Sequence, residues 1–173
     1  MPNEIAHSFP PIAARDARVL ILGSMPGQAS LDAQQYYAYP HNAFWRIMAE
    51  LIGFEVSLPY TERCDALIGV RVAVWDVMQS CVRPGSLDSA IVESTIVPND
   101  FTAFFDQHPE IQQVCFNGAK AESSFRKHVM SELGLAGSRL AYARLPSTSP
   151  AHASLSFDAK RDAWHECLQP LVI

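Results

Sequence analysis

The stretch Val19-Leu20-Ile21-Leu22-Gly23-Ser24-Met25-Pro26-Gly27 decides the fold, because an apolar run passes directly into a turn rich in glycine and proline. Such a short run of branched apolar residues is typical of a strand buried on both faces of a sheet. Similar runs occupy residues 70–77 and 114–116, and residues 140–145 form a weaker fourth. The chain therefore predicts buried strands that each end in a polar loop.

Helical patterns lie between these runs, over residues 43–52, 61–68, 101–107, 120–133 and 156–168. In the last segment Phe157, Trp164 and Leu168 share one face, and we expect Lys160 and Arg161 to point toward solvent. Strands that alternate with helices predict an α/β fold, with a mainly parallel sheet covered on both faces.

The composition excludes disordered and fibrous proteins, because 49% of the 173 residues are hydrophobic and only 18% are charged. We expect residues 1–173 to form a single domain. Neither a membrane-spanning apolar run nor a signal peptide is evident in the sequence, so we expect no membrane partner and a cytoplasmic location. Cys64, Cys81, Cys115 and Cys167 are widely spaced, which favours reduced thiols and neither a metal nor another cofactor.

A net charge of −5 argues against nucleic acid as a partner, since basic surfaces supply most non-specific affinity for it. The charge is distributed unevenly, however, and residues 118–161 carry a net +4. A basic face is therefore permitted.

Ligands of parallel α/β sheets bind beyond the carboxyl ends of the strands, which directs attention to residues 23–39, 76–87, 117–121 and 146–153. The first of these loops is neither a phosphate-binding Walker loop nor a nucleophile elbow, since no Gly-Lys-Ser/Thr follows and Met25 stands at its centre. By itself it could be an ordinary turn.

Three further residue groups have both a structural and a functional interpretation. Asn42 is either the N-cap of a helix or a polar group facing a ligand, while Phe44 and Trp45 are expected in the core. Asn117, after the third strand, is either a turn residue or a reader of a ligand. The loop at 146–153 is either a connector or a rigid segment that offers hydroxyl and backbone N–H groups.

Taken together, the loops resemble the uracil-DNA glycosylase superfamily, and most of all its hypoxanthine-DNA glycosylases. The motifs that carry the resemblance are GSMPG (23–27), YYAYPHNAFW (36–45), WDV (75–77), GSLDS (85–89), FNG (116–118) and LPSTSPA (145–151). The resemblance implies a three-layer α/β/α sandwich around a four-stranded parallel sheet. The clustered cysteines of the iron–sulfur branches are absent from the sequence.

The resemblance also implies roles for individual residues. Met25 replaces the asparagine that activates water in mismatch-specific relatives, so Asn42 is implied as the catalytic residue. Asn117 is implied to read the base and Tyr37 to stack on it, beside Ser24 and Met25. Ser147, Thr148, Ser149, Pro150 and His152 would form a loop that contacts the DNA backbone or intercalates, although we would expect asparagine where His152 stands. Independently of the resemblance, Lys120, Arg126, Arg144 and Lys160 are either phosphate contacts or charges on a solvated face, since no spacing singles them out.

The implied activity is that of a monofunctional DNA glycosylase, a monomer that flips a deaminated base, most readily hypoxanthine, and hydrolyses its N-glycosidic bond to start base-excision repair. No lysine stands in a motif loop to form a Schiff base. The alternatives are a uracil- or mismatch-specific glycosylase of the same superfamily, a catalytically silent damaged-DNA-binding module, and a nucleoside hydrolase.

Overall fold

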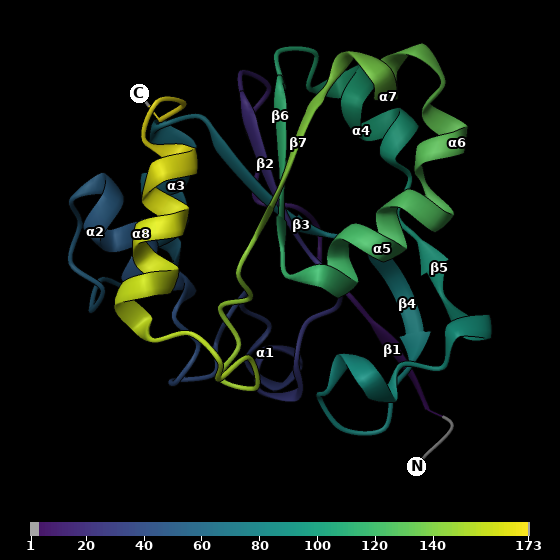
Figure 1. Ribbon diagram of the computed structural model, residues 1–173, viewed down its shortest axis with the longest axis horizontal. Coiled ribbons are helices and arrows are strands. Elements are labelled where there is room, and N and C mark those ends of the chain that lie inside the picture. Colours follow the sequence, from purple (N-terminus) through teal and green to yellow (C-terminus); the bar gives the residue numbers. More distant parts are fainter. Residues whose placement is uncertain (1–3, 173) are drawn as a thin grey trace.

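A four-stranded sheet runs through the centre of the computed structural model, which describes residues 4–172 (Figure 1). Its strands are β2 (Val19–Gly23), β3 (Val72–Asp76), β6 (Gln113–Asn117) and β7 (Ala141–Leu145), in the order β3-β2-β6-β7 and all parallel. The four expected strands are confirmed. The first three residues, part of the segment that we expect not to be a signal peptide, and residue 173 lie outside the described residues.

The parallel register places the carboxyl ends of the strands at one edge of the sheet. Gly23 of β2 is paired with Asp76 of β3, and Asn117 of β6 is paired with Leu145 of β7. Every residue of β2 and β3 is buried, because helices cover both faces. The polar or flexible residues that end these strands therefore meet at this edge.

Helices form a layer on each face of the sheet, which confirms the three-layer α/β/α architecture (Figure 1). One layer contains α2 (Phe44–Ile52), α3 (Tyr60–Gly69) and α8 (Phe157–Leu168). The other contains α4 (Phe101–Gln107), α5 (Ala119–His128), α6 (Met130–Leu133) and α7 (Leu135–Arg139). The short α1 (Gln28–Ala33) lies by the carboxyl ends of the strands. None of the helices within residues 4–172 has the length and apolar character needed to cross a membrane.

Aromatic side chains fill the core on both faces. Phe44 and Trp164, both fully buried, meet edge to face with ring centroids 6.0 Å apart, and this contact joins α2 to α8. On the opposite face Phe125 packs between Phe101 and Phe116, at 5.4 and 5.3 Å. Each buried ring contributes roughly 1.5–3 kcal/mol to folding. The predicted core positions of Phe44 and Trp45 are confirmed.

The structure also contains elements that the sequence did not indicate. A second, antiparallel sheet joins β1 (Ile5–His7), β4 (Met78–Val82) and β5 (Val97–Pro98) in the order β1-β4-β5. Its strands are short and partly exposed, so they carry no clear apolar run. The 3₁₀ turns η1 (Asp88–Ala90) and η2 (Glu93–Thr95) follow β4. The expected helix at 120–133 is interrupted at Val129, which separates α5 from α6.

Candidate active site

A cavity of about 840 Å³ lies at the carboxyl edge of the central sheet. Its lining includes every residue implied to act on the base or to belong to the DNA-contacting loop: Ser24, Met25, Tyr37, Asn42, Asn117, Ser147, Thr148, Ser149, Pro150 and His152. Of the four candidate phosphate contacts, it includes Lys120 but not Arg126, Arg144 or Lys160. The first group of residues comes from four loops that are far apart in the chain. The parallel topology therefore brings the candidate site residues together, as expected for this class of sheet.

The side-chain amide of Asn117 is held in one orientation by Thr148. Asn117 Nδ2 donates a hydrogen bond to Thr148 Oγ1, and the Thr148 backbone N–H donates to Asn117 Oδ1, each at 2.9 Å. A flipped amide would place its NH₂ against that backbone donor, so the second bond excludes the flip. One N–H and one lone pair of the amide are left over for a ligand.

Asn42 precedes α2 but is not its N-cap, as one interpretation of the sequence expected, because the N-cap is the next residue, Ala43. Asn42 Oδ1 accepts a hydrogen bond from Phe44 N at 3.0 Å, near the start of α2, while Asn42 also lines the cavity. The next residue, Ala43, donates its N–H to the carbonyl of Thr148 at 3.0 Å. The amide is thus positioned by the helix start and still has an NH₂ group and an oxygen lone pair to use.

Tyr37 supplies an aromatic surface next to these amides. It has a positive φ of 55°, unusual for a residue with a large side chain, and its ring stacks on Phe44 with centroids 4.1 Å apart. Burial, together with the negative charge of Asp76, raises the pKa of its hydroxyl, which therefore stays protonated. By contrast, Tyr36 donates to Pro10 O at 2.8 Å and belongs to the core, while Tyr39 is exposed.

Ser24 and Met25 form the part of the lining that follows β2. Ser24 Oγ donates to Asp88 Oδ1 at 2.6 Å, which ties this loop to η1. Met25 packs in a small apolar cluster with Met78, Cys81 and other residues. A thioether has no N–H donor and is only a weak acceptor, so Met25 offers shape and polarizable contact.

Asp76 is a residue of the cavity that the sequence reasoning missed. Its side chain is almost entirely buried at the end of β3, and Oδ2 has no hydrogen-bond partner among residues 4–172. Burial, and then the nearby charge of Asp88, raises the pKa of this carboxyl to about 7 in spite of Arg83. The signal available in the sequence was an acid that ends an apolar strand, in the motif Trp75-Asp76-Val77.

Lys160 supports the loop at residues 146–153 through a hydrogen bond to its backbone. The expectation that Lys160 points toward solvent is wrong, because this residue is only 5% exposed and its Nζ donates to Ser149 O at 3.1 Å. The side chain lies under the loop that follows β7, which the helical period alone could not reveal. His152 N also donates to Ser149 O, at 3.0 Å. Lys160 is thus a support of the loop and is poorly placed to meet a phosphate.

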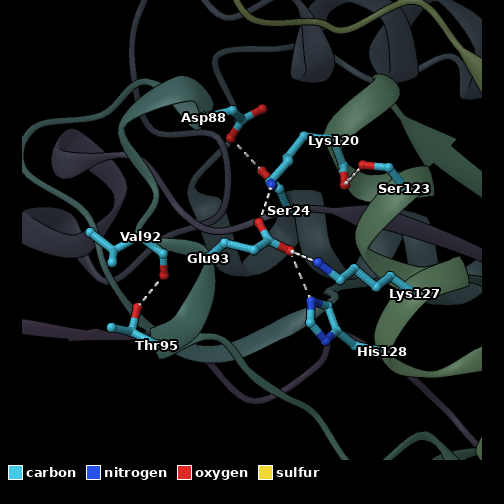
Figure 2. A network of polar contacts seen from close by, with 9 residues as sticks. All are labelled: Ser24, Asp88, Val92, Glu93, Thr95, Lys120, Ser123, Lys127 and His128. Atoms are coloured by element: carbon cyan, nitrogen blue, oxygen red, sulfur yellow. Dashed lines mark hydrogen bonds and ion pairs between the residues drawn. The ribbon is translucent and has the colours of Figure 1, made fainter.

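The other candidate phosphate contacts take part in ion pairs. Figure 2 shows Glu93 surrounded by Lys120, Lys127 and His128, whose nitrogens lie 2.7, 3.4 and 3.1 Å from its carboxylate oxygens. The hydrogen bonds from Lys120 and His128 lower the pKa of Glu93 to about 2. Arg126 and Arg144 both pair with Glu122. Within residues 4–172, no three His, Cys, Asp or Glu side chains are grouped closely enough to hold a metal ion.

Comparison with known proteins identifies the family. The family model of the uracil DNA glycosylase superfamily matches residues 10–171. The chain belongs to the uracil DNA glycosylase superfamily. Membership classes the protein as a DNA glycosylase, an enzyme that hydrolyses N-glycosyl bonds, with DNA as the substrate.

Relatives within this glycosylase superfamily are similar over most of their length. The hypoxanthine DNA glycosylase of Methanosarcina barkeri is 38% identical over 114 residues, which cover 65% of this chain and 71% of the relative. The hypoxanthine DNA glycosylase of Methanosarcina acetivorans is 37% identical over 118 residues, covering 68% and 73%. A solution NMR structure of a candidate uracil DNA glycosylase from Methanosarcina acetivorans superposes with a TM-score of 0.80 and 32% identity, over 97% of this chain and 99% of that one. These relatives support the hypoxanthine-DNA glycosylase branch.

Proposed function

We propose that this glycosylase flips hypoxanthine out of DNA into the cavity and hydrolyses its N-glycosidic bond without a lyase step. The observation that carries the proposal is the fixed amide of Asn117. Hypoxanthine presents the O6 acceptor beside the N1–H donor, whereas adenine presents a donor beside an acceptor. The free N–H and lone pair of Asn117 match hypoxanthine, and adenine would leave buried groups unpaired at about 1–3 kcal/mol each.

Shape and stacking support a purine as the flipped base. The cavity, at about 840 Å³, has room for a purine nucleotide. Tyr37 lines it, and stacking of a base on an aromatic ring contributes roughly 1–3 kcal/mol. Extrusion of a base costs a few kcal/mol and is easiest for a mispaired base, which favours deaminated sites over normal pairs.

Asn42 is the group we propose to position the attacking water. Its oxygen is a hydrogen-bond acceptor and its NH₂ a donor, so it can orient a water molecule. A neutral amide is a poor base, and such positioning suffices if the base departs first and leaves a reactive sugar cation. The absence of a lyase step is supported by Lys120, which lines the cavity but pairs its Nζ with Glu93 Oε2 at 2.7 Å, so this amine is engaged away from the sugar.

The test is a panel of duplex and single-stranded oligonucleotides that each contain one deoxyinosine, deoxyuridine, xanthine nucleotide or T·G mismatch. We expect alkali-labile abasic sites from deoxyinosine, and strand breaks only after alkali treatment. Release of uracil alone would show that the protein is a uracil-specific glycosylase and would contradict the proposal. Salt-sensitive binding to inosine-containing DNA without release of any base would make it a damaged-DNA-binding module.

A further inference from the structure

Asp76 is a buried residue of the lining of the proposed base pocket and takes no part in the chemistry described so far. It faces Gly23 across two paired strands, and both residues line the cavity. A Cβ at Gly23 would come within 2.5 Å of Asp76 Oδ1 and 3.0 Å of Tyr37 Oη. Because glycine at position 23 has no Cβ, the carboxyl of Asp76 and the hydroxyl of Tyr37 can both lie beside it at the cavity lining.

Neither of these two polar groups is satisfied by the protein. Asp76 Oδ2 and Tyr37 Oη are buried, and neither has a hydrogen-bond partner among the described residues. Buried polar atoms are nearly always paired, and an unpaired group at a functional site calls for an explanation. A flipped base with acceptor atoms on its edge would supply the partners.

The groups that surround Asp76 favour its neutral form. Asp88 of η1 faces it with a negative charge, and Tyr36 and Tyr37 add hydroxyls that do not ionise near neutrality. Arg83 supplies the opposing positive charge, but its Nε and Nη2 donate to the carbonyls of Gly85 and Pro26. The effects of burial and of Asp88 outweigh that of Arg83 and raise the pKa of Asp76 to about 7. Near neutral pH the carboxyl therefore holds a proton that it can transfer.

We propose that Asp76 is a catalytic acid that protonates N7 of the departing purine, an inference that rests on the proposed function. As the C1′–N9 bond breaks, its electron pair passes to the purine ring and N7 takes the proton of Asp76. Hypoxanthine then leaves as a neutral base. The water positioned by Asn42 bonds to C1′ and releases a proton to solvent, and Asp76 regains a proton from solvent before the next turnover. The acid thus complements Asn42, which cannot transfer a proton.

Single-turnover hydrolysis of a deoxyinosine oligonucleotide between about pH 5 and pH 9 tests this role. The wild-type rate should be highest below pH 7 and fall about tenfold per pH unit above it, because the acid must be protonated. Asp76→Asn should lower the maximum rate about 100-fold and remove this pH dependence. Asp65→Asn, an exposed substitution on α3, should behave as the wild type. Thermal unfolding shows whether each variant is folded.

A substrate that lacks N7 separates acid catalysis from a structural role. With 7-deaza-2′-deoxyinosine there is no nitrogen for Asp76 to protonate, so the wild type should prefer deoxyinosine strongly and Asp76→Asn should lose at least tenfold of that preference. An unchanged preference, a wild-type rate independent of pH, or an active Asp76→Asn enzyme would each overturn the inference while hypoxanthine release stands. If the wild type releases no base from any lesion, the proposed function fails and this inference with it.

Discussion

Asn117 and Thr148 are 31 residues apart in sequence and are joined by two reciprocal hydrogen bonds of 2.9 Å. The carbonyl of the same Thr148 accepts from Ala43 N at 3.0 Å, directly beside Asn42. One buried threonine therefore connects the amide proposed to read the base with the amide proposed to hold the water. The relative position of the two amides depends on this residue.

Replacement of Thr148 by valine should slow the release of hypoxanthine. Valine keeps the shape and the backbone N–H but removes Oγ1, so Asn117 Nδ2 loses its acceptor and the amide is less firmly oriented. An unpaired buried donor costs about 1–3 kcal/mol, and we expect the single-turnover rate on deoxyinosine to fall roughly tenfold or more. Thr148→Ser, which retains the hydroxyl, should stay close to the wild-type rate. Equal rates for the valine and serine variants would contradict the role of this bond.

Asn42→Ala should abolish most of the activity at a small cost in stability. The variant loses the group that holds the water, and positioning of a reactant is worth at least about 100-fold in rate. Its free energy of unfolding should fall by only about 1 kcal/mol, since one bond at a helix start is lost. Asp100→Ala is the matched control, because it removes the comparable bond to Ala103 N at the start of α4. Full turnover by Asn42→Ala would refute the proposed mechanism.

Tyr37→Ala should reduce the affinity for DNA that contains a flipped-base analogue. Loss of base stacking is worth roughly 1–3 kcal/mol, or about tenfold or more in Kd, which fluorescence anisotropy with a non-cleavable 2′-fluoroarabino-inosine duplex would measure. Tyr37→Phe keeps the ring and removes a hydroxyl that has no hydrogen-bond partner within residues 4–172, so we expect no loss of stability. Equal affinities of the alanine and phenylalanine variants would show that the ring does not contact the base.

The buried carboxyl of Asp76 should make stability depend on pH. Its pKa is raised from 3.8 to about 7 on folding, so the folded protein binds this proton more tightly than the unfolded chain. Stability from this group is therefore complete below pH 3.8 and declines as the pH rises to about 7. Relative to the wild type, Asp76→Asn should gain up to ~4 kcal/mol between about pH 4 and pH 8. Denaturant unfolding at the two pH values measures this change, and a constant difference would contradict it.

Glu93→Gln should increase the affinity for DNA. The low pKa of Glu93, about 2, keeps it ionised at every pH of interest, where it neutralises Lys120 and Lys127. Without this charge the lysines can contact phosphates, and the slope of log K against log salt should steepen by up to about 2. Glu132→Gln, an exposed substitution on α6, is the control. An unchanged slope would mean that this cluster does not face DNA.

Much of the fold could be predicted because apolar periodicity is a local property. The four central strands and the segments of α2, α3, α4 and α8 all follow from it, as does the location of the cavity at the carboxyl ends of the strands. The small sheet of β1, β4 and β5 could not, because short, half-exposed strands carry no such signal. The break between α5 and α6 at Val129 likewise has no counterpart in the helical period of the sequence.

The sequence by itself determined the succession of the four central strands along the chain, the family resemblance and the candidate residues in the loops, since each of these depends on local residue types. Only the tertiary structure decided which groups are buried and what they contact. It turned Lys160 inward beneath Ser149, fixed the amide of Asn117 against Thr148, and enclosed Asp76 beside Gly23. Burial and hydrogen bonding depend on residues distant in the chain, and these surroundings set the protonation and orientation of each group in the cavity.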